Sequence, residues 1–170
     1  MFDIIHVLTF RYIDDVISFN NSRFNNFLSM IYPPELEIKE TTESDSSASY
    51  LDIFLKYDTN GHLSTRLYDK RDDFNFSIIN FPYLDSNIPH SPSYGVYISQ
   101  LIRYARACTS YRDFAERHSL LSRKLVNQGY TKRRLASTFK RFFGRCHDLI
   151  DKYGVSLRQM ITDGIGDNCL

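Results

Sequence analysis

Two adjacent carboxylates, Asp14 and Asp15, interrupt an otherwise apolar and aromatic stretch that reads LTFRYIDDVISFNN from residue 8 to residue 21. Divalent cations bind clustered carboxylate oxygens, so this pair could form one side of a metal site for phosphoryl transfer. Aspartate is also a common turn residue, and a hairpin turn explains the pair without any metal. Turns that serve only to reverse the chain usually contain Gly or Asn, which the short link between the two apolar runs lacks, and this favours the metal-binding interpretation.

Cations concentrate farther along the chain. Residues 101–145 contain 12 Lys and Arg against 2 Asp and Glu, whereas residues 1–100 contain 7 against 14. The surface of a soluble helix normally carries both signs of charge, so the shortage of acidic residues indicates a polyanionic partner, and phosphate backbone binding explains it best. The residues expected to contact nucleic acid are Arg103, Arg106, Arg123, Lys124, Lys132, Arg133, Arg134, Lys140 and Arg141.

The carboxylates belong to a part of the chain that predicts strands. β-Branched and aromatic runs flank Asp14-Asp15, which indicates a hairpin with the two aspartates at its turn. The segment 23–31 has apolar residues at helical spacing, so we expect a short helix, ended by Pro33-Pro34, that covers one face of the sheet. The Ser-rich segment 41–49 predicts a polar loop, and Asn60-Gly61 between two alternating runs predicts a second hairpin.

The cations belong to a part of the chain that predicts helices. Three segments around Leu101, Leu121 and Phe139 have apolar residues at helical spacing, and Gly129 and Gly144 are expected to end the second and third helices. The fold class is therefore expected to be α+β. A small antiparallel sheet with a covering helix occupies residues 1–90, and an α-helical bundle occupies residues 91–170.

Composition limits the class of protein further. The chain is 42% hydrophobic and 15% aromatic, which is enough for a buried core. No apolar run approaches the roughly 20 residues that cross a bilayer, so no membrane partner is expected. Three cysteines without C-x-x-C spacing, together with the lack of a secretory signal, predict free thiols in an intracellular protein, nuclear or cytoplasmic and not secreted.

The segment FRYIDDV, from Phe10 to Val16, resembles motif C of reverse transcriptases, the palm-domain hairpin that carries a metal-binding aspartate. The resemblance continues through ASYLDIFLKYDTNGHLSTRLYDK, YISQLIRYARAC and LLSRKLVNQGY. Their order is similar to the end of the palm and the start of the thumb in Penelope-like reverse transcriptases, which are retroelement enzymes. The resemblance spans about residues 8–135 and depends on the order of several segments.

This resemblance implies an RNA-directed DNA polymerase, in which the sheet is a partial palm and the helices are a thumb-like region. Asp14 would be the catalytic, metal-binding aspartate and Asp15 its weaker partner. Tyr12 would lie beside the primer terminus, and Lys70 would touch a phosphate at the primer grip. In the complete enzyme the cofactor would be Mg²⁺, or Mn²⁺ in its place. The partners would be an RNA template, an RNA:DNA or DNA duplex, and deoxynucleotides.

Two parts of such a polymerase have no counterpart before Leu8. Reverse transcriptases need another aspartate on an earlier palm strand, and Asp3 is too close in sequence to Asp14 to take that role. The fingers also have no room there. We therefore expect the C-terminal part of a larger polymerase, with little or no activity alone. One alternative is a non-catalytic nucleic-acid-binding remnant that acts through residues 101–145, and another is an unrelated α+β domain that binds other anions.

Overall fold

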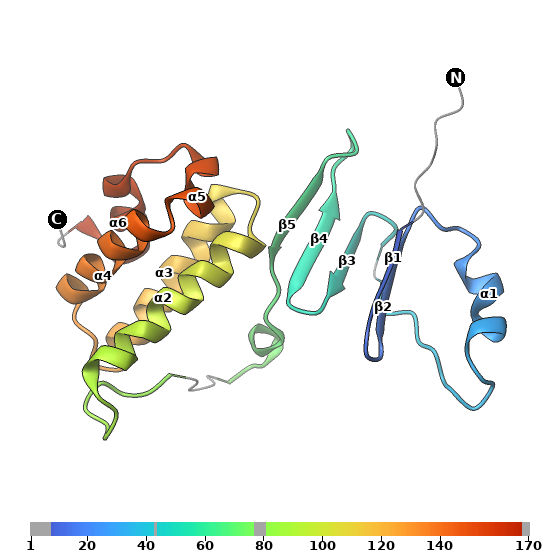
Figure 1. Cartoon of the computed structure of the whole chain (residues 1–170), viewed down its shortest axis with the longest axis horizontal. Coiled ribbons are helices and arrows are strands. Elements are labelled where there is room, and N and C mark those ends of the chain that lie inside the picture. The colour runs from blue at the N-terminus through green and yellow to red at the C-terminus, as the bar shows by residue number, and fades with distance from the viewer. Residues whose placement is uncertain (1–7, 43, 77–80, 168–170) are drawn as a thin grey trace.

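The computed structural model describes residues 8–42, 44–76 and 81–167. Within these ranges the chain has an α+β fold, with a two-stranded and a three-stranded antiparallel sheet and six α-helices. The elements follow one another along an elongated molecule, from α1 and the first hairpin through the three-stranded sheet to the bundle of helices (Figure 1). The α+β class expected from the sequence is therefore confirmed.

The first hairpin pairs β1 (Leu8–Tyr12) with β2 (Asp15–Phe19). Residues that are opposite or two apart share one face of a hairpin, so Phe10 and Phe19 lie on the same face. Their ring centroids are 6.4 Å apart, and Phe19 also lies 6.3 Å from Tyr57 of the neighbouring sheet. This row of aromatic rings connects the hairpin to the three-stranded sheet.

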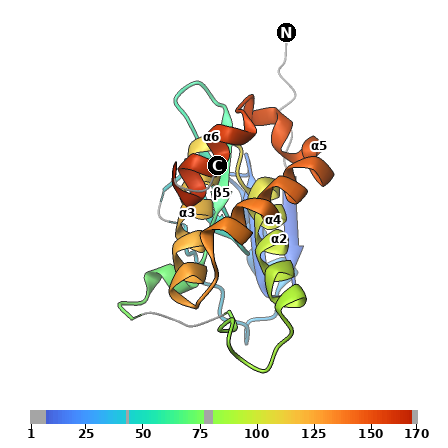
Figure 2. The same ribbon diagram turned by 90° about the vertical axis from the view of Figure 1, so that its left-hand side faces the viewer.

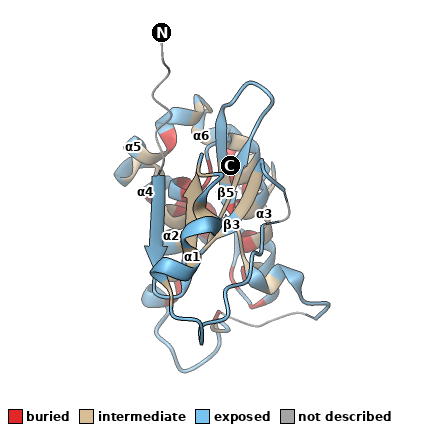
Figure 3. Cartoon of the chain, turned by 90° about the vertical axis from the view of Figure 1, so that its right-hand side faces the viewer, coloured by how far each residue is buried: buried red, intermediate tan, exposed pale blue. Residues whose placement is uncertain are grey.

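Helix α1 (Phe24–Ile31) forms where the spacing predicts it and ends before Pro33-Pro34. None of its residues is buried, and Met30 is 80% exposed. The expectation that this helix covers a face of the sheet is wrong, as the exposed colouring of α1 shows (Figure 3). The physical reason is that a two-stranded hairpin offers too narrow a surface to bury the apolar side of a helix.

Strands β3 (Ser47–Tyr50), β4 (Ile53–Tyr57) and β5 (Leu63–Leu67) form an antiparallel meander. The predicted hairpin at Asn60-Gly61 is confirmed, with Gly61 at φ +79°, a conformation that favours glycine. β3 lies at the end of the Ser-rich segment, so the prediction of a loop is wrong there. Pairing with β4 along its whole length outweighs the weak strand preference of its serines.

The other helices form a bundle on the far side of the sheet (Figure 2). The three helices predicted from apolar spacing correspond to α2, α3 and α4. No helix in the described ranges combines the length and the apolar character needed to cross a membrane. The helices and the two 3-10 turns are α2 (His90–Ala107), α3 (Tyr111–Asn127), α4 (Lys132–Arg145), α5 (His147–Ile150), α6 (Leu157–Ile165), η1 (Lys70–Asp73) and η2 (Asp151–Tyr153).

The two glycines predicted to end helices behave differently. Gly129 follows α3 at φ +91°, and its backbone N–H donates to the carbonyl of Val126 at 3.1 Å, so this helix ends as predicted. Gly144 lies inside α4, which continues to Arg145, so the prediction that it ends the helix is wrong. Phe142, fully buried two residues earlier, anchors this last turn, and its packing outweighs the low helix propensity of glycine.

The buried core belongs to the second part of the chain. Among the described residues, Leu67 at the end of β5 is the first that is buried, and all the others follow Phe81 or are Phe81 itself. In Figure 3 the hairpin, α1 and β3 carry only the colours of exposed or half-buried residues. Tertiary stability therefore comes mainly from the helical bundle.

The three-stranded sheet is attached to the bundle through the outer edge of β5. The backbone N–H of Thr109 donates to the carbonyl of Thr65 at 2.9 Å, and the N–H of Thr65 donates to the Thr109 hydroxyl at 3.0 Å. Nearby, Arg117 of α3 forms an ion pair with Asp72 of η1 and donates to the carbonyl of Leu67 at 3.2 Å. The link between α2 and α3 thus acts as the neighbour that β5 would otherwise lack.

The helices of the bundle meet at His118, whose side chain is fully buried. Its ring stacks on Phe139 of α4, with centroids 4.7 Å apart, and its Nε2 shares a 2.5 Å hydrogen bond with the hydroxyl of Tyr97 on α2. Gly164 of α6 lies directly against this ring, since a Cβ added there would be 1.9 Å from Nδ1. Burial lowers the pKa of His118 to about 3, so the imidazole is neutral at physiological pH.

Gly164→Ala should lower the free energy of unfolding by about 1–3 kcal/mol, because the added methyl group overlaps the His118 ring and forces α3 and α6 apart. Gly95→Ala is the matched control, since Gly95 lies in α2 with nothing within 4 Å of an added Cβ. Alanine is favoured in helices, so this control should be slightly stabilised. Chemical denaturation measures both variants. Equal stabilities would contradict the close contact at Gly164.

Stability should fall as the pH drops below about 6.5, because the unfolded chain then binds a proton at His118 and the folded chain does not until about pH 3. The expected slope is up to about 1.4 kcal/mol per pH unit. The measurement is the free energy of unfolding between about pH 6.5 and 5 for the wild type and His118→Gln.

Asp69 does not interfere with this measurement. The hydrogen bond from Arg71 lowers the pKa of Asp69 to about 2, so the stability that Asp69 contributes is lost only below pH 3.8, outside this window. Equal slopes for both proteins would refute the assignment.

Candidate nucleic-acid interface

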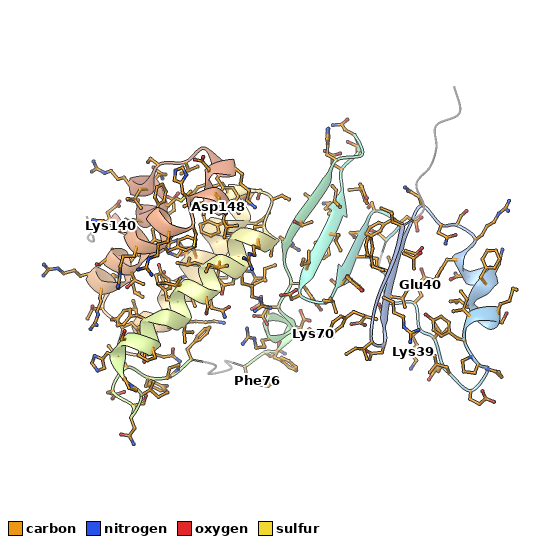
Figure 4. The ribbon with its side chains drawn as sticks, in the orientation of Figure 1. Lys39, Glu40, Lys70, Phe76, Lys140 and Asp148 are labelled. Carbon is orange, nitrogen blue, oxygen red and sulfur yellow. The ribbon has the colours of Figure 1, made fainter. Side chains whose placement is uncertain are left out.

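Helix α4 turns its aromatic residues inward and its cations outward. Leu135, Phe139 and Phe142 are buried, and the helix contains no acidic residue. α4 lies on the side of the bundle away from the sheets (Figures 1 and 2), and Figure 4 shows Lys140 pointing away from the protein. Its exposed cations are Lys132, Arg133, Arg134, Lys140, Arg141 and Arg145.

The positive charge of α4 has little compensation within the protein. Three consecutive cations occupy the first turn, without an acidic residue, although cations at the positive end of the helix dipole cost roughly 0.3–1 kcal/mol each. Thr131, at the N-cap position, makes no side-chain capping hydrogen bond. In the described ranges, no ion pair joins a cation of α4 to a carboxylate. An external anion would relieve this unfavourable arrangement.

Three cations of the predicted interface have partners inside the protein, and one of them, Arg141, donates to the hydroxyl of Thr138 at 3.4 Å. The Nε of Arg103 lies 2.9 Å from the Oδ2 of Asp52, and this ion pair joins α2 to the turn before β4. The guanidinium of Arg134 lies 4.7 Å from the ring centroid of Tyr94, although the side chain remains exposed. The interface therefore centres on α4 and the end of α3. Exposed cations of the predicted set outside α4 are Arg106, Arg123 and Lys124.

The carboxylate pair lies at the tip of the first hairpin, one residue away from the predicted register. The two turn residues are Ile13 and Asp14, and Asp15 is already the first residue of β2, opposite Tyr12. Ile13 has φ +53°, whereas Asp14 does not have a positive φ. Both aspartates are exposed. The turn thus forms without Gly or Asn, at the cost of a strained β-branched residue.

The described residues do not complete a metal site around this pair. No group of three His, Cys, Asp or Glu side chains within the described ranges is close enough to hold a metal ion. A two-ion site needs carboxylates on at least two adjacent strands, and Asp14 and Asp15 come from one turn and the strand that follows it. Asp3 lies outside the described residues. The carboxylates that are described do not by themselves fit a two-ion site.

The remaining predicted site residues lie at different places along the molecule. Tyr12 is 56% exposed and pairs in register with Asp15, so the structure brings it beside the carboxylates. Lys70 begins η1 and lies between the hairpin and the bundle (Figure 4). The hairpin and α4 are separated by the three-stranded sheet (Figure 1). Asp14 and Asp15 therefore do not share a surface with the basic helix.

A second turn of the same kind was not foreseen from the sequence. Leu51, with φ +56°, and Asp52 join β3 to β4, so Tyr50-Leu51-Asp52 repeats the arrangement of Tyr12-Ile13-Asp14. Here the carboxylate has a structural role, because Asp52 binds Arg103 of α2. The repeated order of Tyr, an aliphatic residue and Asp is the sequence signal that could have revealed it.

The chain was compared with protein-family models, with curated proteins and with solved structures, and none of these comparisons finds a match. The likeness to reverse transcriptases thus rests on the sequence segments that carry it. The case for a function rests on the geometry and charge of the chain's own residues.

Ile13→Gly should stabilise the first hairpin by about 1 kcal/mol, because glycine adopts a positive φ without the steric cost that isoleucine has there. Amide hydrogen exchange in β1 and β2 should slow by about fivefold. Val16→Gly, in β2, is the control and should speed the same exchange, because glycine weakens a strand interior. Faster exchange in Ile13→Gly would show that the turn is not strained.

Proposed function

We propose that this protein binds the phosphodiester backbone of nucleic acid through the exposed basic surface of α4 and the end of α3. One observation carries the proposal: the cations of α4 are exposed and, in the described ranges, not paired with any carboxylate. Binding of phosphates explains why α4 keeps cations at its N-terminus, where the helix dipole makes positive charge unfavourable. The contact is indifferent to sequence, since it is made by charge.

The nucleic acid in this proposal is an RNA template or its RNA:DNA or DNA duplex, and the protein corresponds to the palm end and thumb of a Penelope-like reverse transcriptase. Two features support this part. The motif-C-like segment forms a hairpin with Asp14 at its tip, and the basic helices follow the sheet in the expected order. Polymerisation with Mg²⁺ and deoxynucleotides would need carboxylates besides Asp14 and Asp15.

Replacing Lys132, Arg133 and Lys140 with Gln should weaken binding to an RNA:DNA hybrid. The slope of log affinity against log salt concentration should decrease in magnitude by about 2 to 3, because three phosphate contacts are lost. Fluorescence anisotropy over a series of salt concentrations measures both quantities. All three side chains are exposed, so the fold should be kept, and its stability should rise slightly because two cations leave the positive end of the helix dipole.

The matched control replaces Arg23, Lys39 and Lys56 with Gln. These exposed cations lie before β5, and the control has the same net charge as the first variant. It should keep the affinity and the salt slope of the wild type. If both variants bound the hybrid equally weakly, the loss of affinity would follow from the net charge and not from the position of the cations. No salt-sensitive binding by the wild type would refute the proposal and favour an unrelated α+β domain.

A further inference from the structure

Five of the six exposed cations of α4, all except Lys132, form two rows. With 3.6 residues per turn, residues seven apart fall almost in line, so Arg133 and Lys140 form one row. Arg134, Arg141 and Arg145 form a second row, about 100° around the helix from the first. Each row extends over about 10 Å or more. All five side chains are exposed.

Small residues occupy the helix surface between the rows. Ser137 and Gly144 are also seven apart and fall between the two rows on the helical period, and both are exposed. A Cβ added at Gly144 would meet nothing within 4 Å. The helix therefore has a low floor, formed by Ser137 and Gly144, with a row of cations on each side.

The second row has more contacts within the protein than the first. The guanidinium of Arg134 lies over the ring of Tyr94, and the Nη2 of Arg141 donates to the hydroxyl of the buried Thr138 at 3.4 Å. In the first row, Lys140 extends into solvent (Figure 4). Arg134 and Arg141 of the second row are thus held in position by the protein, and Lys140 of the first row is free to adjust to a ligand.

The outward face of α4 offers no ring on which a base could stack. The aromatic residues of this helix are Phe139 and Phe142, which are buried, and Phe143, which is half-buried with its ring 5.7 Å from His147. Proteins that hold single strands by their bases use exposed aromatic platforms. A ligand on this face is therefore recognised by its phosphates rather than by its bases.

We propose that one phosphodiester backbone lies lengthwise along α4, between the two rows, with its phosphates close to the floor at Ser137 and Gly144 and its bases turned away from the protein. This inference rests on the proposed function and specifies the ligand geometry at the same surface. Contact with one backbone does not require a paired strand. Single-stranded RNA and duplex should therefore use the same face.

Gly144→Leu tests this geometry, because it raises the floor without changing any charge. The probes are a fluorescein-labelled oligouridylate of about twenty nucleotides and an RNA:DNA hybrid of the same length, and anisotropy measures the affinity for each. Gly144→Leu should lower both affinities by roughly tenfold, the loss expected for one charge-assisted contact. The matched control is Gly95→Leu, at another exposed helical glycine with nothing within 4 Å of an added Cβ. It should change neither affinity.

The outcomes separate this inference from the proposed function. Wild-type affinity of Gly144→Leu for both probes would overturn the lengthwise placement and leave charge-driven binding intact. Weakening on the hybrid alone would overturn the single-backbone contact, since the face would then need both strands. If the wild-type protein binds neither probe, the proposed function itself fails, and the inference fails with it.

Discussion

One buried ring determines how the helices of the bundle are arranged. His118 contacts α2 through Tyr97, α4 through Phe139, and α6 through the bare backbone at Gly164. Its Nδ1 has no hydrogen-bond partner in the described part of the chain, so the site accepts only a neutral, closely packed side chain. The basic interface depends on this packing. By fixing the inward side of α4 at Phe139, the ring also fixes which side presents the cations.

Most of the helical part could be predicted because its signal is local. Apolar residues at helical spacing mark the helices. Gly129 marks the end of α3 because a helix commonly ends at a residue with positive φ, a conformation that glycine adopts readily. The predictions that failed concern features that depend on tertiary contacts. β3 forms from serines because β4 pairs with it, and α4 continues through Gly144 because Phe142 is anchored in the core. The position of α1 was predicted correctly, but the expectation that it covers a face of the sheet was wrong.

For the candidate site too, the local features could be predicted from the sequence and the features that depend on tertiary contacts could not. The excess of cations in residues 101–145 is visible in the sequence, and most of these side chains are exposed in the structure. Sequence alone could not reveal that Arg103 is held by Asp52, since 51 residues separate them along the chain. Nor could it separate the hairpin from α4, because adjacency in a fold depends on packing. The carboxylate pair was located to within one residue, since the turn depends on local geometry.

None of the described residues before Leu67 is buried, and this has a thermodynamic consequence. The denaturant dependence and the heat capacity of unfolding both scale with the surface that unfolding exposes. Strands that bury little in the folded state add little to either quantity. The cooperative transition of this chain should therefore have the m-value of a domain of roughly 100 residues, well below that of an ordinary domain of its full length. The part of the chain that unfolds cooperatively is therefore the helical bundle together with β5, the strand that the bundle holds.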